Sequence, residues 1–166
     1  MRMDKLTSKF QMAVADAQSL AVGKDHQFIE PVHLLIALLD QQGGTARHLL
    51  TKAGAKVDLL RSRVGEALDQ MPTVQGAAGE VHLSNELSKM LNVTDKLAQD
   101  KGDQYISSEL FLLAACNDTG PLGKTLRDCG AVSGAVDQAI EELRGGAQAN
   151  DPNAEDTRQA LDKYTV

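Results

Sequence analysis

The residues of this sequence that come nearest to a known chemistry are Gly123, Lys124 and Thr125, because Gly-Lys-Thr ends a phosphate-binding P-loop. That motif also needs a glycine five residues earlier, where this chain has Asp118, whose carboxylate would repel a phosphate. Pro121 removes one of the backbone N–H donors that the loop requires. A P-loop follows a buried strand, whereas the apolar run here has a helical pattern. The sequence therefore predicts a helix–helix turn and a short helix, and no nucleotide site.

Histidines and cysteines are the other side chains that could ligate a metal ion or act in catalysis. They are His26, His33, His48, His82, Cys116 and Cys129. The sequence has no H-E-x-x-H, C-x-x-C or G-x-S-x-G motif. A Cys–His dyad stays open on the sequence alone, but both cysteines stand in apolar patterns that are typical of small buried side chains. We therefore expect no metal site and no enzymatic activity in this chain.

The composition indicates a helical domain with a mildly acidic surface. Apolar residues make up 42% of the 166 residues, while aromatic residues are only 3%. Leu and Ala dominate, and they favour helices packed on helices. The formal charge of -6 does not suit a nucleic-acid binder, which needs a basic stripe. No apolar run approaches the ~20 residues of a membrane span, and no secretion signal is present. We expect a cytoplasmic location and no nucleic-acid or membrane partner.

An internal repeat decides how the candidate residues are positioned. QFIEPVHLLIALLDQQGG (27–44) is similar to QYISSELFLLAACNDTGP (104–121), and the same shift of 77 residues aligns Thr7 with Ser84. After one deletion the match resumes at a shift of 76 residues. The P-loop-like segment aligns with DQQGGTARHLL, which resembles no phosphate site. The repeat thus supports the interpretation of that segment as a turn.

Each copy of the repeat is predicted to form four helices. In the first copy, Thr7 or Ser8 caps a helix whose apolar residues recur at a spacing of 3.6. Pro31 opens the second helix at its first turn, Thr45 caps the third, and the fourth stops before Pro72. The second copy repeats this plan. The predicted fold class is therefore all-α, with two pseudo-repeats of four helices each, followed by a flexible linker.

The same patterns predict the boundaries of the domain. It covers residues 1–146, with repeat one at 5–72, a Gly-rich connector at 73–81 and repeat two at 82–146. Residues 147–160 are polar and contain a proline, so we expect a flexible linker there. An apolar pattern is just resuming in residues 161–166, which we interpret as the truncated start of a following module.

Four segments of the chain resemble one protein family. They are LTSKFQMAVADAQSLA, FIEPVHLLIALL, YISSELFLLAA and the closing RGG…DPNAEDTRQALDKYTV. Over essentially the whole chain they are similar to the N-terminal Clp-repeat domain of the ClpB family of disaggregase chaperones, which act in the stress response. The resemblance implies a mobile, non-catalytic domain of a homohexameric ATPase. It implies that residues 161–166 are the start of an ATPase module and that ATP binds in modules after residue 166. It also implies that this domain holds no cofactor and that the fragment is monomeric.

The resemblance also implies a function and the residues that carry it. The domain would bind exposed hydrophobic segments of unfolded or aggregated proteins and deliver them to the pore of the ring. The alternative is a domain that docks an adaptor or regulates its own ring. The family's functional positions are matched here by Thr7, Asp103 and Glu109, and Ser84 matches another characteristic position. No feature of the sequence separates the two functions cleanly, although the closing segment favours the first.

These four residues also have a purely structural interpretation. Thr7 and Ser84 are equivalent helix N-caps, and the loss of such a cap typically costs ~1 kcal/mol. Glu109 stands in the first turn of its helix, where the helix dipole favours a carboxylate. Asp103 stands in the turn before that helix, where side-chain bonds to the backbone are common.

Comparison of the two repeats favours a surface site for Asp103 and Glu109. Repeat one has His26 and Val32 at the aligned positions, so the fold of the repeat does not require the pair of carboxylates. A site for unfolded proteins also needs flexible apolar side chains in a shallow groove. We predict that Leu91 and Leu110 line that groove.

Overall fold

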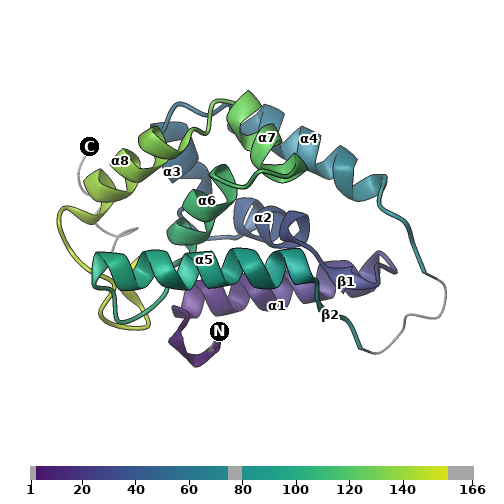
Figure 1. Ribbon diagram of the computed structural model, residues 1–166, viewed down its shortest axis with the longest axis horizontal. Helices are drawn as coiled ribbons and strands as arrows, with labels where there is room; N and C mark the ends of the chain where they lie inside the picture. The colour runs from purple at the N-terminus through teal and green to yellow at the C-terminus, as the bar shows by residue number, and fades with distance from the viewer. Residues whose placement is uncertain (1–2, 75–79, 157–166) are drawn as a thin grey trace.

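The computed structural model describes residues 3–74 and 80–156 of the chain (Figure 1). Its elements are η1 (Met3–Lys5), α1 (Ser8–Gly23), β1 (Phe28–Ile29), α2 (Pro31–Asp40), α3 (Ala46–Lys52), α4 (Val57–Asp69), β2 (His82–Leu83), α5 (Asn85–Lys101), α6 (Ser108–Cys116), α7 (Pro121–Asp128) and α8 (Ser133–Arg144). Repeat one forms α1 to α4 and repeat two forms α5 to α8. The prediction of an all-α fold with two repeats of four helices is confirmed.

The first helix of each repeat begins at its predicted capping residue, whereas Thr45 stands at the N-cap of α3 without a side-chain cap bond. The hydroxyl of Thr7 accepts the N–H of Phe10 at 3.3 Å, and that of Ser84 accepts the N–H of Leu87 at 3.0 Å. These bonds satisfy N–H groups that have no partner inside the helix. Pro31 is the first residue of α2, as predicted. The two first helices, α1 and α5, therefore start in the same way in both repeats.

Short backbone pairings tie the two repeats together. Ile29 in β1 lies opposite Leu83 in β2, and Leu6 lies opposite Ile106, in both cases in parallel. A shift of 77 residues converts one pair into the other. The segment before the first helix of each repeat thus pairs with the segment before the second helix of the other repeat. This exchange joins the backbone of each repeat to that of the other.

The core is shared between the repeats. Helices α2 and α6 lie in the middle of the molecule, with α1 and α5 along one edge of the view and α3, α4, α7 and α8 along the other (Figure 1). All residues of α6 are buried. The ring of Phe10 from α1 packs against that of Phe111 from α6, with centroids 6.2 Å apart. Burial of this apolar surface is the main force that holds the helices together.

The segment after α8 differs from its prediction. Residues 147–156, which we name the strap, were expected to belong to a flexible linker, but they lie against the domain. Ala149 is fully buried and Ala154 is 7% exposed. The carbonyl oxygen of Ala149 accepts the N–H groups of Gln104 and Tyr105, at 3.0 and 2.8 Å. Residues 157–166, the rest of the predicted linker and the predicted module start, lie outside the described residues, as do residues 75–79 of the connector.

Candidate functional site

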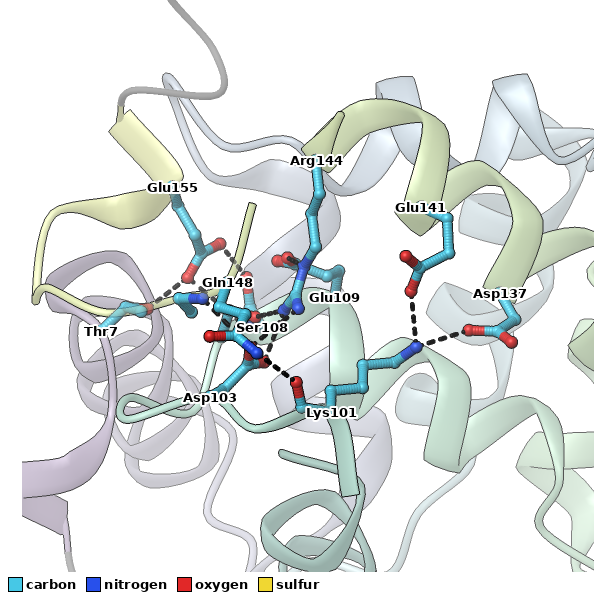
Figure 2. Close-up of polar contacts among 12 residues, drawn as sticks. Thr7, Lys101, Asp103, Ser108, Glu109, Asp137, Glu141, Arg144, Gln148 and Glu155 are labelled. Carbon is cyan, nitrogen blue, oxygen red and sulfur yellow. Dashed lines mark hydrogen bonds and ion pairs between the residues drawn. The ribbon is translucent and has the colours of Figure 1, made fainter. Parts of the chain in front are cut away.

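Three of the predicted site residues meet in one buried cluster of polar side chains (Figure 2). We name it the polar cluster, and its members are Thr7, Asp103, Ser107, Ser108, Glu109, Arg144 and Glu155. Four elements supply these residues: the start of α1, the loop and first turn of α6, the last residue of α8, and the strap. The side chains of Asp103 and Glu109 are fully buried, so neither carboxylate lies at the surface, where comparison of the repeats had placed them.

Arg144 holds one half of the polar cluster together. Its guanidinium lies 2.8 and 3.0 Å from the two carboxylate oxygens of Asp103 and 3.2 Å from Oε1 of Glu109. It also donates to the hydroxyl of Ser107 at 2.9 Å. The Arg144 side chain is only 3% exposed, so these acceptors replace the water that the charge has lost. Removing one partner from a buried pair typically costs about 3–5 kcal/mol.

Glu155 of the strap holds the other half. Its carboxylate accepts hydrogen bonds from the hydroxyls of Thr7 and Ser108, and from the backbone N–H of Ser108 at 3.2 Å. Ser108 is the first residue of α6, and Thr7 is the N-cap of α1. Two helix N-termini therefore converge on one carboxylate, and the positive ends of both helix dipoles stabilise its charge. Glu155 is 2% exposed.

The other three predicted residues contribute no side chain to this cluster. Ser84 caps α5 and contacts no member of the polar cluster through a described hydrogen bond. Leu91 is 2% exposed and Leu110 is fully buried, and both belong to the hydrophobic core. The prediction that these leucines line a surface groove is thus corrected: each lies on the inward face of its helix, where the apolar stripe directs it.

Four cluster residues were not among the predicted site residues: Ser107, Ser108, Arg144 and Glu155. The two charged ones differ in the signal that the sequence gave. Arg144 follows Ile140 by four residues, so it continues the apolar face of α8, where an unpaired charge would not be tolerated. The position of Arg144 on this face could therefore have predicted a buried ion pair. Glu155 gave no such signal, since the polar strap has no periodic pattern from which its burial could be predicted.

An apolar groove lies on another part of the surface, where its smaller hollow is lined by residues of both repeats and its larger hollow by residues of repeat two alone. It consists of two adjoining hollows of about 260 and about 410 Å³, which share Glu86, Asp118 and Pro121. We name it the α4–α7 groove. The apolar side chains that line it are Pro31, Val32, Val64, Ala67, Met71, Met90, Val93, Ala114, Pro121 and Leu122. The larger hollow falls within the range of roughly 300–1,000 Å³ that is typical of ligand pockets, and the smaller one lies just below it.

The described residues offer little for catalysis. Among them no group of three or more His, Cys, Asp or Glu side chains could hold a metal ion. Both cysteines are buried, and burial raises the pKa of the Cys116 thiol to about 12, which keeps it protonated and unreactive. In residues 3–74 and 80–156, no helix has both the length and the apolar character needed to cross a membrane.

The P-loop-like residues lie within a helix. Gly123, Lys124 and Thr125 belong to α7, and Lys124 pairs with Asp128 at 2.7 Å. The glycine has a packing role, because a Cβ at this position would lie 2.0 Å from the carbonyl oxygen of Asp118. The helix–helix turn and short helix predicted here are confirmed.

Comparison with known proteins agrees with this fold. Residues 5–129 match the family model of the Clp repeat (R) N-terminal domain. The chain is 55% identical over 166 residues to "Chaperone protein ClpB" of Vibrio cholerae and 56% identical over 166 residues to the protein of the same name from Pseudomonas putida. Both alignments cover all of this chain but 19% of the relative, so the chain spans about a fifth of the length of these curated relatives.

A solved structure shows the same fold. The crystal structure of the Hsp104 N-terminal domain from Candida albicans superposes with a TM-score of 0.81 at 20% sequence identity. The match covers 91% of this chain and 99% of that one. At this identity the likeness concerns the fold alone.

Proposed function

The chain belongs to the Clp repeat N-terminal domain family, and from this premise we propose that it is the substrate-binding domain of a ClpB-type disaggregase. It would bind exposed hydrophobic segments of unfolded or aggregated proteins and pass them to the pore of a hexameric ATPase ring. The domain itself would be monomeric, non-catalytic and free of cofactor, with ATP bound elsewhere in the longer protein. We place this protein in the cytoplasm.

The observation that carries the proposal is the α4–α7 groove. Several of its apolar side chains are accessible: Val93 is 49% exposed, and Val32, Met71 and Leu122 are partly buried. Accessible apolar surface of this kind, rimmed by charged residues such as Glu86 and Lys89, is typical of sites that bind other polypeptides. Two methionines line it, and flexible thioether side chains suit a site that accepts many sequences.

Leu91 and Leu110 then contribute to binding only indirectly. Both lie in the core beneath the surface, where they hold α5 and α6 in place. The polar cluster also contacts none of the residues that line the groove through a described hydrogen bond. We therefore assign substrate contact to the groove and a structural role to the buried leucines.

The proposal is tested by an NMR titration of the chain with a permanently unfolded protein, such as reduced and carboxymethylated lactalbumin. We expect shifts at amides of α4, α5 and α7 around the groove. Val93→Asp should weaken binding about tenfold, because a buried Val contact is worth about 1.5 kcal/mol and each 1.4 kcal/mol changes an affinity tenfold.

Met12→Asp is the matched control. Met12 is 54% exposed in the middle of α1 and is not among the residues that line the groove, so its replacement should change the affinity by less than about twofold. Equal weakening by both substitutions would point to non-specific hydrophobic contact and contradict the assignment. If several unfolded proteins cause no change in the amide chemical shifts, the substrate-binding function is contradicted and an adaptor-docking domain is favoured.

A further inference from the structure

Polar contacts fasten the strap (147–156) to the domain along its length. Two of them are side-chain contacts near the surface: Gln148 donates to the carbonyl oxygen of Lys101 at 3.2 Å, and the carboxylate of Asp156 lies 3.6 Å from the ammonium of Lys9. At its start, the N–H of Ala149 donates to Asp103 at 3.0 Å, while its carbonyl oxygen accepts from the loop before α6. In its middle, the carbonyl oxygen of Pro152 accepts the N–H of Ser8 at 2.8 Å. At its end, the carboxylate of Glu155 binds the hydroxyls of Thr7 and Ser108.

These fastenings involve three of the four residues that the family resemblance singled out, namely Thr7, Asp103 and Glu109, whereas Ser84 only caps α5. Thr7 binds the end of the strap and Asp103 binds its start, and Arg144 joins Asp103 to Glu109. Figure 2 shows the strap residue Glu155 and these side chains gathered around the start of α6. None of them lines the α4–α7 groove. A substitution among them therefore acts first on the strap.

Little apolar surface holds the strap in place. Its buried apolar residues are two alanines, Ala149 and Ala154. The methyl side chain of an alanine is too small to anchor the strap in the core. Segments with few buried apolar contacts open locally at a much lower free energy than the core does. The strap can therefore leave the surface while the helices stay folded, provided the polar bonds break.

We propose that the strap is a latch, closed by Glu155 at the joined N-termini of α1 and α6, which sets how far the domain can reach from the chain that follows it. Closed, the strap ends against the domain. Open, its ten residues become tether, which adds up to about 33–36 Å to the span of the connection. Thr7, Asp103, Ser108 and Arg144 are positioning residues of this latch.

The latch is independent of the proposed substrate groove, so it can be tested separately. Four amide protons report on its state: those of Ser8, Gln104 and Tyr105 donate to the strap, and that of Ala149 donates from it. Hydrogen exchange of these amides, followed by NMR in the whole chain, measures opening. The amides of Leu35 in α2 and Leu113 in α6 report on the core.

Glu155→Ala removes the closing carboxylate, and Asp156→Ala is the matched control. Asp156 is the next residue, also acidic, but its side chain is 49% exposed and lies 3.6 Å from Lys9. We expect Glu155→Ala to speed exchange at the four reporter amides at least about tenfold and to leave the core amides unchanged, whereas Asp156→Ala should change neither set by more than about twofold.

Three results would overturn the latch: no change at the reporter amides, an equal rise at the core amides, or an equal effect of the two substitutions. Thr7→Ser and Thr7→Val add a check that does not touch the strap sequence. Serine keeps the hydroxyl that binds Glu155, so the four reporter amides should stay protected from hydrogen exchange. Valine removes that hydroxyl, so exchange at these amides should become faster. Exchange that rises equally in both Thr7 variants would also contradict the proposal.

Discussion

The imidazoles of His26 and His33 form a buried pair inside repeat one, at the position where repeat two has the polar cluster. Their Nδ1 and Nε2 atoms lie 2.8 Å apart, and Nδ1 of His33 accepts the N–H of Glu30 at 2.8 Å. Because Nδ1 of His33 is an acceptor, the proton of the neutral ring is on Nε2, which donates to His26. The arrangement therefore requires two neutral rings.

Acid should weaken the fold through this pair. Burial, together with the neighbouring His26, lowers the pKa of His33 to about 4, and burial also lowers the pKa of His26. Between the ordinary histidine pKa of about 6.5 and pH 4, the unfolded chain binds more protons than the folded chain, so stability falls as pH falls. We expect His33 to lower the free energy of unfolding by about 2 kcal/mol as the pH falls from 7.5 to 4.5.

Urea unfolding of the wild type and of His33→Leu across this pH range measures the contribution of His33 to the free energy of unfolding. The two proteins have the same carboxylates, so the difference between them isolates the histidine. Leucine is the residue that repeat two has at the aligned position, Leu110. His82→Gln is the control, because the side chain of His82 is 75% exposed and should leave the pH dependence unchanged. The same pH dependence in His33→Leu as in the wild type would contradict the assignment.

At the scale of elements, the loops after α3 and α7 meet where the two repeats join. Gly54 and Gly130 are aligned residues, both left-handed, with φ of +94° and +97°. The N–H of Lys56 donates to the carbonyl oxygen of Cys129 at 2.8 Å. A Cβ on Gly130 would lie 2.9 Å from the carbonyl oxygen of Gly54, whereas a Cβ on Gly54 would meet nothing within 4 Å.

This asymmetry gives a matched pair of substitutions. Gly54→Ala should cost about 1 kcal/mol of unfolding free energy, the ordinary penalty of alanine in a left-handed conformation. Gly130→Ala carries the same penalty and also pushes the two loops apart, so we expect about 2–3 kcal/mol. Thermal and urea denaturation of both variants would measure the difference. An equal loss would mean that the loops separate freely and that the contact between the repeats is weak here.

For the molecule as a whole, sequence reasoning recovered the helices because their signals are local. The caps at Thr7 and Ser84, the proline that opens α2 and the repeat itself each depend on residues close in the chain or on internal similarity. The groove could not be derived in this way, since it forms where α4 of one repeat packs near α7 of the other. Leu91 and Leu110 were misplaced because an apolar helical stripe does not by itself distinguish a core residue from a groove residue.

The strap was missed for a different physical reason. Hydrophobic periodicity detects segments that are held by apolar burial, whereas this segment is held by hydrogen bonds to a carboxylate and to backbone groups. Its polar composition is the same as that of a mobile linker. Only the partners of Glu155, which lie more than forty residues away in the chain, distinguish the two.

Because the core and the strand pairings are shared, neither repeat should fold alone. Residues 1–74 would lose the partners of Leu6 and Phe10, and residues 80–166 would lose those of Ile106 and Phe111. Isolated short helices are marginal in water, so each fragment should lack a cooperative thermal transition. Mixing the two fragments at tens of micromolar should restore helical circular dichroism and one transition.

The control is the whole chain cut at a protease site inserted in the connector, which should stay folded. A fragment that unfolds cooperatively on its own would show that the repeats are separate folding units joined by a weak interface.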